Sequence, residues 1–267
     1  MIKIQNLCKA FKTSEGVVHA LKNVSLQIED GSCVVIGGEN GSGKSVLMSI
    51  IAGLEEADSG CVEFVEKVDF GTETGSSAKI GSKTNTCSDG SKSLPPRAGL
   101  VFQEAETQIL GETPREDIAF GPKNLGWKKE QIQAAVENAL NQTGLTKKAD
   151  FPARFLSGGE KRRLAVACML AMDLPVIILD EPYANLDYGG VKQVNALVKQ
   201  LKLAGKTVII LTHEIEKCLA LADKFAVLFR GEKKFEGLPQ DGLLQPLEEW
   251  NIRNPLVSYS CVQDLVW

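Results

Sequence analysis

The segment "GGENGSGKS", residues Gly37 to Ser45, decides the fold of this 267-residue chain. Its last eight residues match the pattern G-x-x-x-x-G-K-[ST] in full. The apolar run 33–36 comes directly before it, and helix-spaced apolar residues follow Gly43. These neighbours are the strand and the helix that the pattern needs, whereas a plain glycine-rich turn needs neither. The segment therefore predicts a phosphate-binding loop in an α/β protein.

In such a loop, backbone N–H groups point inward and cradle the phosphates, and the following helix adds its positive N-terminal end. The residues that we expect to supply this cradle are Gly38, Asn40, Gly41, Ser42 and Gly43. Lys44 would reach the β- and γ-phosphates, and Ser45 would hold Mg²⁺. The loop thus predicts a magnesium-bound phosphate chain as the ligand.

Composition narrows the class of protein. The net charge of −4 and the pI of about 5.4 argue against bulk affinity for nucleic acid. The seven cysteines are scattered without a C-x-x-C pair, which indicates reduced thiols rather than a disulfide frame or a zinc site. The chain starts directly in a strand-like pattern, and no apolar run approaches the roughly 18 residues of a membrane span. We therefore expect no signal peptide and no span.

Hydrophobic periodicity predicts the remaining elements. Residues 1–36 alternate apolar and polar positions, which favours an antiparallel strand set that ends in the buried strand 33–36. We expect further strands at 61–65, 100–102, 176–179 and 208–211. Helical spacing places an apolar face on Val46, Leu47, Ile50, Ile51 and Leu54, and predicts further helices within 128–145 and 191–201. Strands that alternate with helices predict a mostly parallel sheet.

Residues 71–93 form a low-complexity stretch, in which 14 of 23 residues are Gly, Ser or Thr. Such a composition offers almost nothing to bury, so it cannot offset the entropy lost on ordering. We expect a mobile surface loop here. A regulatory role is the remaining alternative.

A second motif, Val176 to Glu181, is an apolar strand that ends in two adjacent acids. At the carboxyl end of a parallel strand, Asp180 can face the Mg²⁺ shell. Glu181 can then face the attacking water, as a base or as a positioning group. The alternative is that the acids only cap the exit of the strand. Beside a complete phosphate-binding loop, the pair favours hydrolysis of the phosphate chain.

A third motif, "LSGGE" at 156–160, indicates a helix N-terminus in isolation, with Ser157 as the cap and Glu160 completing a capping box. A capped helix start with two glycines is also a second anion site. With this motif, the chain resembles the ATP-binding-cassette (ABC) ATPases over about residues 1–240. The resemblance implies ATP as the ligand. It also implies that the γ-phosphate of ATP on a partner subunit is contacted by Ser157, Gly158 and Gly159.

Four further residues match positions of this family, and the resemblance supplies their roles. Gln103 matches the glutamine that touches Mg²⁺ and water, and His213 matches the histidine that contacts the γ-phosphate. Asp187 matches the family's D-loop and is expected at the nucleotide. Phe11 lies where an aromatic ring usually stacks on adenine, unless it is a core phenylalanine.

Two departures from the family pattern qualify the match. Tyr188 follows Asp187 where proline is common, and the 71–93 loop is longer than usual. Neither departure involves the residues expected to hydrolyse ATP. His19, the only other histidine, is expected at the surface.

The stretch 102–126 narrows the resemblance further. Together with "LSGGEKRR" it is similar to the ATPase subunits of energy-coupling-factor (ECF) importers, which take up vitamins or cobalt and nickel ions. In such ATPases this region binds the coupling helices of a membrane subunit, and a groove there would receive a helix by its apolar face. Ordinary packing of the subdomain is the alternative, as is an ATPase from another ABC importer or an export system.

Two other classes share these motifs. DNA-repair or chromosome-maintenance ATPases carry long coiled-coil insertions, whereas here Lys44 and Ser157 are only 113 residues apart (157 − 44) and no heptads occur. A soluble regulatory ABC ATPase without a membrane partner is the other class. Co-purification of membrane subunits would separate it from a transporter ATPase.

The sequence therefore predicts an α/β nucleotide-binding domain over 1–240, with a parallel core sheet and an N-terminal antiparallel β portion. A helical subdomain is expected near 104–172, and a C-terminal extension over 241–267 that packs on its own subunit or on a second ATPase. Two ATPase subunits, identical or paralogous, would face each other head to tail. Membrane subunits would hold them at the cytoplasmic face of the cell membrane. The cargo stays open, because the ATPase does not touch it.

Overall fold

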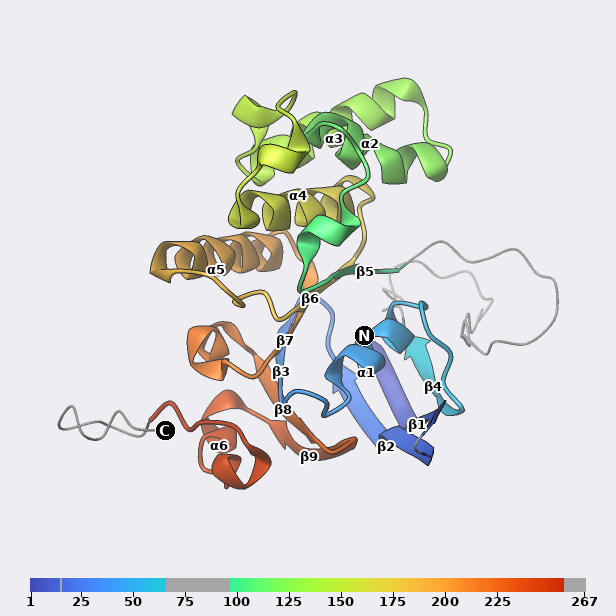
Figure 1. Ribbon diagram of the computed structural model, residues 1–267, viewed down its shortest axis with the longest axis vertical. Coiled ribbons are helices and arrows are strands. Elements are labelled where there is room, and N and C mark those ends of the chain that lie inside the picture. Colours follow the sequence, from blue (N-terminus) through green and yellow to red (C-terminus); the bar gives the residue numbers. More distant parts are fainter. Residues whose placement is uncertain (15, 66–96, 257–267) are drawn as a thin grey trace, which may run out of the picture.

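The computed structural model describes residues 1–14, 16–65 and 97–256 (Figure 1). The predicted loop 71–93 and the last part of the predicted extension, 257–267, lie outside the described residues. Within them, the chain forms two sheets and a set of helices.

The larger sheet has six strands in the order β5-β6-β7-β3-β8-β9. Their bounds are β3 (Cys33–Gly37), β5 (Ala98–Val101), β6 (Val176–Asp180), β7 (Thr207–Thr212), β8 (Lys224–Phe229) and β9 (Glu232–Gly237). The first five in sheet order are parallel, and β9 pairs antiparallel with β8. Strands buried on both faces are near-continuous apolar runs, as β3, β6 and β7 are. The sequence predicted these three strands, but we did not predict β8 and β9.

The predicted strand at 100–102 differs in its bounds. β5 ends at Val101, and Phe102 is exposed rather than buried. The reason is local: the side-chain oxygen Oε1 of Gln108 accepts from the Phe102 N–H at 2.8 Å, and its Nε2 donates to Leu100 O at 2.9 Å. The chain therefore turns away from the sheet directly after Val101.

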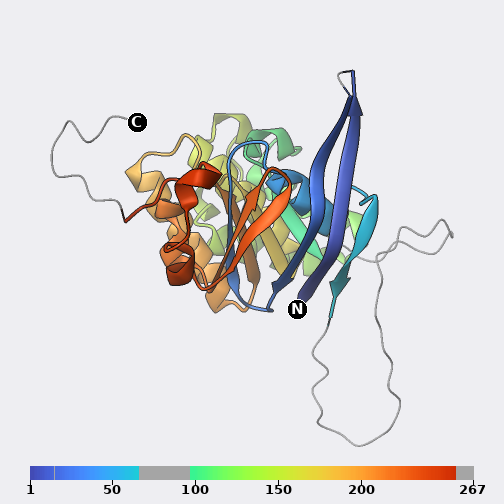
Figure 2. The same ribbon diagram turned by 90° about the horizontal axis from the view of Figure 1, so that it is seen from below.

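The smaller sheet is antiparallel, in the order β2-β1-β4. Its strands are β1 (Ile2–Thr13), β2 (Gly16–Ile28) and β4 (Ser59–Phe64). The first helix, α1 (Lys44–Ile51), lies between this sheet and the larger one (Figure 2). The predicted apolar face of the helix is wrong at Leu54, which is 63% exposed because α1 ends at Ile51.

Three helices form a separate layer around a core of their own (Figure 1). They are α2 (Pro114–Asn124), α3 (Lys129–Gln142) and α4 (Gly158–Ala171). α4 also packs against the larger sheet, on the face that α5 (Tyr188–Leu203) covers. The last helix, α6 (Pro239–Gly242), packs on β8 and β9. No helix in 1–14, 16–65 or 97–256 is long and apolar enough to cross a membrane.

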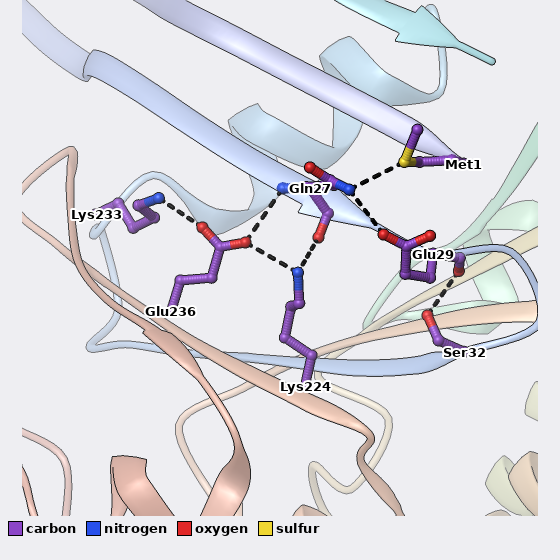
Figure 3. Close-up of polar contacts among 7 residues, drawn as sticks. All are labelled: Met1, Gln27, Glu29, Ser32, Lys224, Lys233 and Glu236. Atoms are coloured by element: carbon purple, nitrogen blue, oxygen red, sulfur yellow. Dashed lines mark hydrogen bonds and ion pairs between the residues drawn. The ribbon is translucent and has the colours of Figure 1, made fainter.

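A polar cluster joins the edges of the two sheets (Figure 3). The Lys224 ammonium on β8 donates to Gln27 O on β2 at 2.6 Å and to Oε1 of Glu236 at 3.0 Å. Lys233 donates to the other carboxylate oxygen of Glu236 at 2.6 Å. Burial raises the pKa of Glu236, but the hydrogen bonds from Lys233 and Lys224 outweigh burial and lower the pKa below its ordinary value. The cluster fixes the antiparallel sheet against the strands that carry the site.

Candidate nucleotide site

The loop between β3 and α1 has a backbone that only glycine can supply at Gly43. Gly43 has φ 100°, and a Cβ there would lie 2.3 Å from Ala20 O on β2. Gly41 has φ 81°, which also favours glycine. The expected cradle residues, 38–43, therefore lie on one tight loop that begins a helix. Such a loop can hold an anion with its backbone N–H groups.

The Lys44 ammonium is folded over this loop and only 5% exposed. It donates to Gly38 O at 2.8 Å and to Glu39 O at 3.0 Å, and lies 3.8 Å from Oε1 of Glu181. Burial lowers the pKa of Lys44, while the charges of Glu181 and Asp180 oppose that shift. The cation is thus fixed in place beside the loop, where it can meet an anionic ligand.

Two acids lie at the carboxyl end of β6, opposite the loop. Glu181 takes φ 44°, and its N–H donates to Leu211 O on β7 at 2.9 Å, so its backbone is held in a strained position. Burial raises the pKa of Asp180, and a hydrogen bond with Ser45 opposes this shift. The predicted pair therefore lies at the sheet edge, within reach of the helix that carries Lys44.

Three buried side-chain atoms at this place have no hydrogen-bond partner within the described part of the chain. They are Oγ of Ser42, Oδ1 of Asp180 and Oε2 of Glu181. Buried polar atoms normally have a partner, so these oxygens indicate room for a ligand or ion. A carboxylate and a hydroxyl are also the hard oxygen donors that Mg²⁺ prefers, and Mg²⁺ commonly takes one or two carboxylates with the rest from phosphate and water. The residues present fit such an ion.

His213 completes the cluster from the next strand of the sheet. It follows the end of β7, and its Nδ1 lies 3.0 Å from Oε1 of Glu181. Half of its side chain is exposed. The ring therefore lies between the buried carboxylate and the space above the loop.

The remaining predicted residue of this edge, Gln103, follows β5 and is exposed. Its backbone oxygen accepts from Nη2 of Arg162 on α4 at 3.2 Å. Since β5 and β6 pair in parallel, Gln103 and the two acids leave the sheet at the same edge. Sequence reasoning did not identify Arg162, because its role as a link to the Gln103 backbone has no local pattern.

The "LSGGE" motif starts α4 with a reciprocal cap. Ser157 Oγ accepts from Glu160 N at 3.3 Å, and Oε2 of Glu160 accepts from Ser157 N at 2.9 Å. Ser157 and Gly158 are exposed, and a Cβ on Gly158 or Gly159 would meet no described heavy atom within 4 Å. The capping-box expectation agrees with this geometry. The helix start is open to an anion from outside.

The structure does not bring this helix start to the chain's own phosphate-binding loop. α4 belongs to the helical layer, whereas α1 lies between the two sheets, well apart from it in Figure 1. Asp187 is also outside the cluster: it caps α5 by accepting from Gly190 N at 2.7 Å. One chain therefore carries the two predicted anion sites on separate surfaces.

Phe11 lies on β1 and is 37% exposed, so the alternative of a core phenylalanine is wrong. The Lys9 ammonium lies 5.1 Å from its ring centroid. His19, on β2, is exposed as expected. The stacking of Phe11 on adenine stays a prediction.

Comparison with known proteins identifies the family. The family model described as "ABC transporter" matches residues 21–184. The cobalt import ATP-binding protein CbiO of Rhodobacter capsulatus is 38% identical over 243 residues, covering 87% of this chain and 81% of that protein. The energy-coupling factor transporter ATP-binding protein EcfA2 of Methanospirillum hungatei is 38% identical over 222 residues, or 83% of this chain. The matched part is 52% of that protein, so the chain spans about half the length of this relative.

A solved structure agrees with these sequence matches. The structure of cbiO1 from Clostridium perfringens, described as part of the ABC transporter complex cbiONQ, has a TM-score of 0.73 and 29% identity. The match covers 95% of each chain. The chain belongs to the ABC transporter family. The predicted fold class, the ATPase class and the similarity to energy-coupling-factor ATPases are confirmed.

Proposed function

We propose that this chain is the ATP-hydrolysing subunit of an importer of the energy-coupling-factor type, which takes up a vitamin or a transition-metal ion. One observation carries the proposal: Lys44, Asp180, Glu181 and His213 converge at the phosphate-binding loop, where one oxygen of each carboxylate has no partner among the described residues. The relatives named above support the transport role. The chain would work at the cytoplasmic face of the cell membrane, on membrane subunits.

Each part of the site would have its own role in binding and hydrolysing ATP. Backbone N–H groups of the loop and the Lys44 ammonium would hold the phosphates of ATP. Ser45, Gln103 and Asp180 would hold Mg²⁺, which neutralises charge on the β- and γ-phosphate oxygens when bound. Glu181 would polarise or position the attacking water, and His213 would orient the Glu181 carboxylate and meet the γ-phosphate.

A second subunit would complete each site. The capped start of α4 is exposed and open, so Ser157, Gly158 and Gly159 can meet the γ-phosphate of ATP held by a partner. Asp187 would lie near the same junction. ATP would close the pair, and hydrolysis with product release would reopen it, which the membrane subunits would sense.

The membrane subunit would bind in a groove on the helical layer. A cavity of about 370 Å³ lies between α2 and the end of α4, with Met169 and Met172 in its wall. Three apolar side chains of the same region are exposed: Leu110, Phe120 and Leu125. Apolar and methionine-rich grooves receive amphipathic helices, so this groove fits a coupling helix. Its α2 side lies within the stretch 102–126, whose sequence is similar to importer ATPases.

Purification from membranes tests the proposal. The tagged chain, extracted in detergent, should bring down integral membrane subunits and a second ABC ATPase. Phe120→Glu should abolish their recovery, since it places a charge in the groove, and ATP binding by the isolated chain should survive. Leu203→Glu, which changes an exposed apolar residue on α5 in the same way, is the control. Recovery of no membrane protein with the unmodified chain would favour a soluble regulatory ATPase.

A further inference from the structure

The C-terminal segment 247–252 reaches the phosphate-binding loop by a contact that the sequence motifs do not include. The side-chain amide of Asn251 donates from Nδ2 to Oε2 of Glu39 at 2.5 Å. The two residues are 212 positions apart in the sequence. Figure 2 shows the red C-terminal segment beside the blue loop that joins β3 to α1.

This segment is anchored to the core on both sides of Asn251. Leu247 and Ile252 are each 1% exposed and belong to the core beneath α5. The Ile252 N–H donates to Leu247 O at 2.9 Å, which closes the turn. Asn251 takes φ 55°, a left-handed conformation that asparagine tolerates better than most residues. The amide is therefore presented to the loop by a fixed backbone.

Glu39 places a carboxylate in a loop whose ligand is an anion. Its backbone oxygen and that of Gly38 both accept from the Lys44 ammonium. Burial lowers the pKa of Lys44, and the charge of Glu39 is one of those that oppose this shift, so the carboxylate acts on the ammonium. A glutamate side chain released from its partner can rotate. It would then compete with a phosphate for Lys44 and repel that phosphate.

We infer that Asn251 is a positioning residue for the nucleotide, which holds the Glu39 carboxylate against the C-terminal segment and out of the path of the phosphates. The inference rests on the proposed phosphate-binding role of the loop 38–45. It makes the affinity for ATP depend on the docked state of segment 247–252. The negative charge of Glu39, which would weaken the binding of ATP, is thereby kept at the rim of the site.

The test measures binding of a fluorescent ATP analogue, with Mg²⁺, to the purified full chain. Asn251→Gly keeps the left-handed backbone and removes the amide, so it should weaken binding about three- to tenfold, which is the size of the net contribution of one ordinary hydrogen bond. Asn251→Asp sets two carboxylates against each other and should weaken binding more. Glu39→Ala removes the competing charge and should bind at least as tightly as the unmodified chain.

A double variant separates positioning from mere support of the fold. In the Glu39→Ala background, Asn251→Gly should have no further effect on affinity, because the carboxylate it controls is gone. An equal loss in both backgrounds, or unchanged affinity in Asn251→Gly alone, would overturn the inference. Glu249→Gln, on the same segment, is the control and should bind normally.

Lys44→Ala in the same assay distinguishes a wrong phosphate site from a wrong role for Asn251. If Lys44→Ala binds like the unmodified chain, the proposed phosphate site itself is wrong. If Lys44→Ala loses binding while both Asn251 variants bind normally, only the role of Asn251 is refuted.

Discussion

Lys44 and Glu181 form a buried pair of opposite charges at the centre of the candidate site, with 3.8 Å between Nζ and Oε1. Such pairs are stable only when their remaining donors and acceptors also find partners. Lys44 has two loop carbonyls, and Glu181 has His213. The second oxygen of Glu181 has none among the described residues, which leaves it for water or ligand.

Lys44→Ala should reduce both nucleotide binding and hydrolysis. The ammonium is the fixed cation of the loop, and each charge-assisted bond to a phosphate is worth roughly 1.5–3 kcal/mol. Binding and phosphate release should be measured on the purified chain, with the exposed Lys199→Ala on α5 as the control. A folded Lys44→Ala variant that hydrolyses ATP at the normal rate would refute the assignment of the loop.

Asp180→Asn should raise the free energy of unfolding of the ligand-free protein at neutral pH. Burial raises the pKa of Asp180, so its ionised form costs free energy in the folded state. Protonated Asp180 stabilises the folded state. This stabilisation is fully present below the pKa of Asp180 in the unfolded chain, roughly 3.9, and it is lost as the pH rises through the raised pKa of the folded state.

The gain from Asp180→Asn should therefore be present at neutral pH and disappear as the pH falls below about 4. Urea unfolding at several pH values measures it. Asp241→Asn, at an exposed acid of α6, is the control. Hydrolysis dependent on Mg²⁺ should fall in Asp180→Asn, and a variant that is less stable at neutral pH would contradict the buried-charge account.

At the scale of elements, the sequence predicts the strands best where burial is complete. β3, β6 and β7 are runs of buried apolar residues next to site motifs, so period and motif agree. β8 is equally apolar, but no motif adjoins it, and β9 is a polar edge strand. β8 is placed by pairing with β3 across almost two hundred residues, which no local pattern contains, and β9 then pairs with β8.

The ends of the helices also depend on features that hydrophobic spacing alone does not contain. α1 stops at Ile51, and Gly53 turns the chain with φ 74°, so Leu54 leaves the apolar face despite its spacing. α2 was not identified, because Gly121 and Pro122 interrupt its pattern. Its start is nevertheless marked by Thr113 as cap and Pro114 at the first helical position.

Asp117 on α2 illustrates an element held by one buried carboxylate. Its Oδ1 accepts from Leu110 N at 2.7 Å and Gly111 N at 2.8 Å, and its Oδ2 accepts from the thiol of Cys168 at 3.3 Å. Asp117→Ala would leave these buried donors without a partner. We expect the free energy of unfolding to fall by roughly 2–4 kcal/mol, since each lost bond of this kind costs about 1–3 kcal/mol.

Chemical unfolding measures the effect of Asp117→Ala, with Glu130→Ala as the control at an exposed acid of α3. The control should change stability by less than about 1 kcal/mol, since an exposed acid in the first turn of a helix contributes no more than that. A loss of the same small size in Asp117→Ala would show that the carboxylate does not hold the segment 110–111. It would also mean that the shape of the neighbouring groove does not depend on how Asp117 holds segment 110–111.

For the whole molecule, the sequence implies which four residues of the candidate site converge, but not the contact from the end of the chain. Lys44, Asp180, Glu181 and His213 converge because three parallel strands end at one edge, which the strand pattern already implies. Ser157 lies elsewhere on the surface. The contact between Asn251 and Glu39 could not be foreseen, because it depends on how the end of the chain folds back.

We propose that ATP is hydrolysed between two subunits, with the phosphate-binding loop from one and the start of α4 from the other. Glu181→Gln keeps the shape of the side chain but cannot act as a carboxylate base. It should bind ATP and lose about 10²–10⁴ in hydrolysis rate, the usual contribution of such a group. Unspent ATP should then hold the pair closed.

Light scattering after size exclusion of Glu181→Gln, alone or with its paralogue, tests this claim most directly, with bound nucleotide assayed in parallel. The account predicts a dimer in ATP and a monomer in ADP. Adding Ser157→Arg should abolish the ATP-dependent dimer without emptying the loop, whereas adding Gln200→Arg at an exposed site on α5 should leave it intact. An ATP-dependent dimer that survives Ser157→Arg would contradict the arrangement of the site across two subunits.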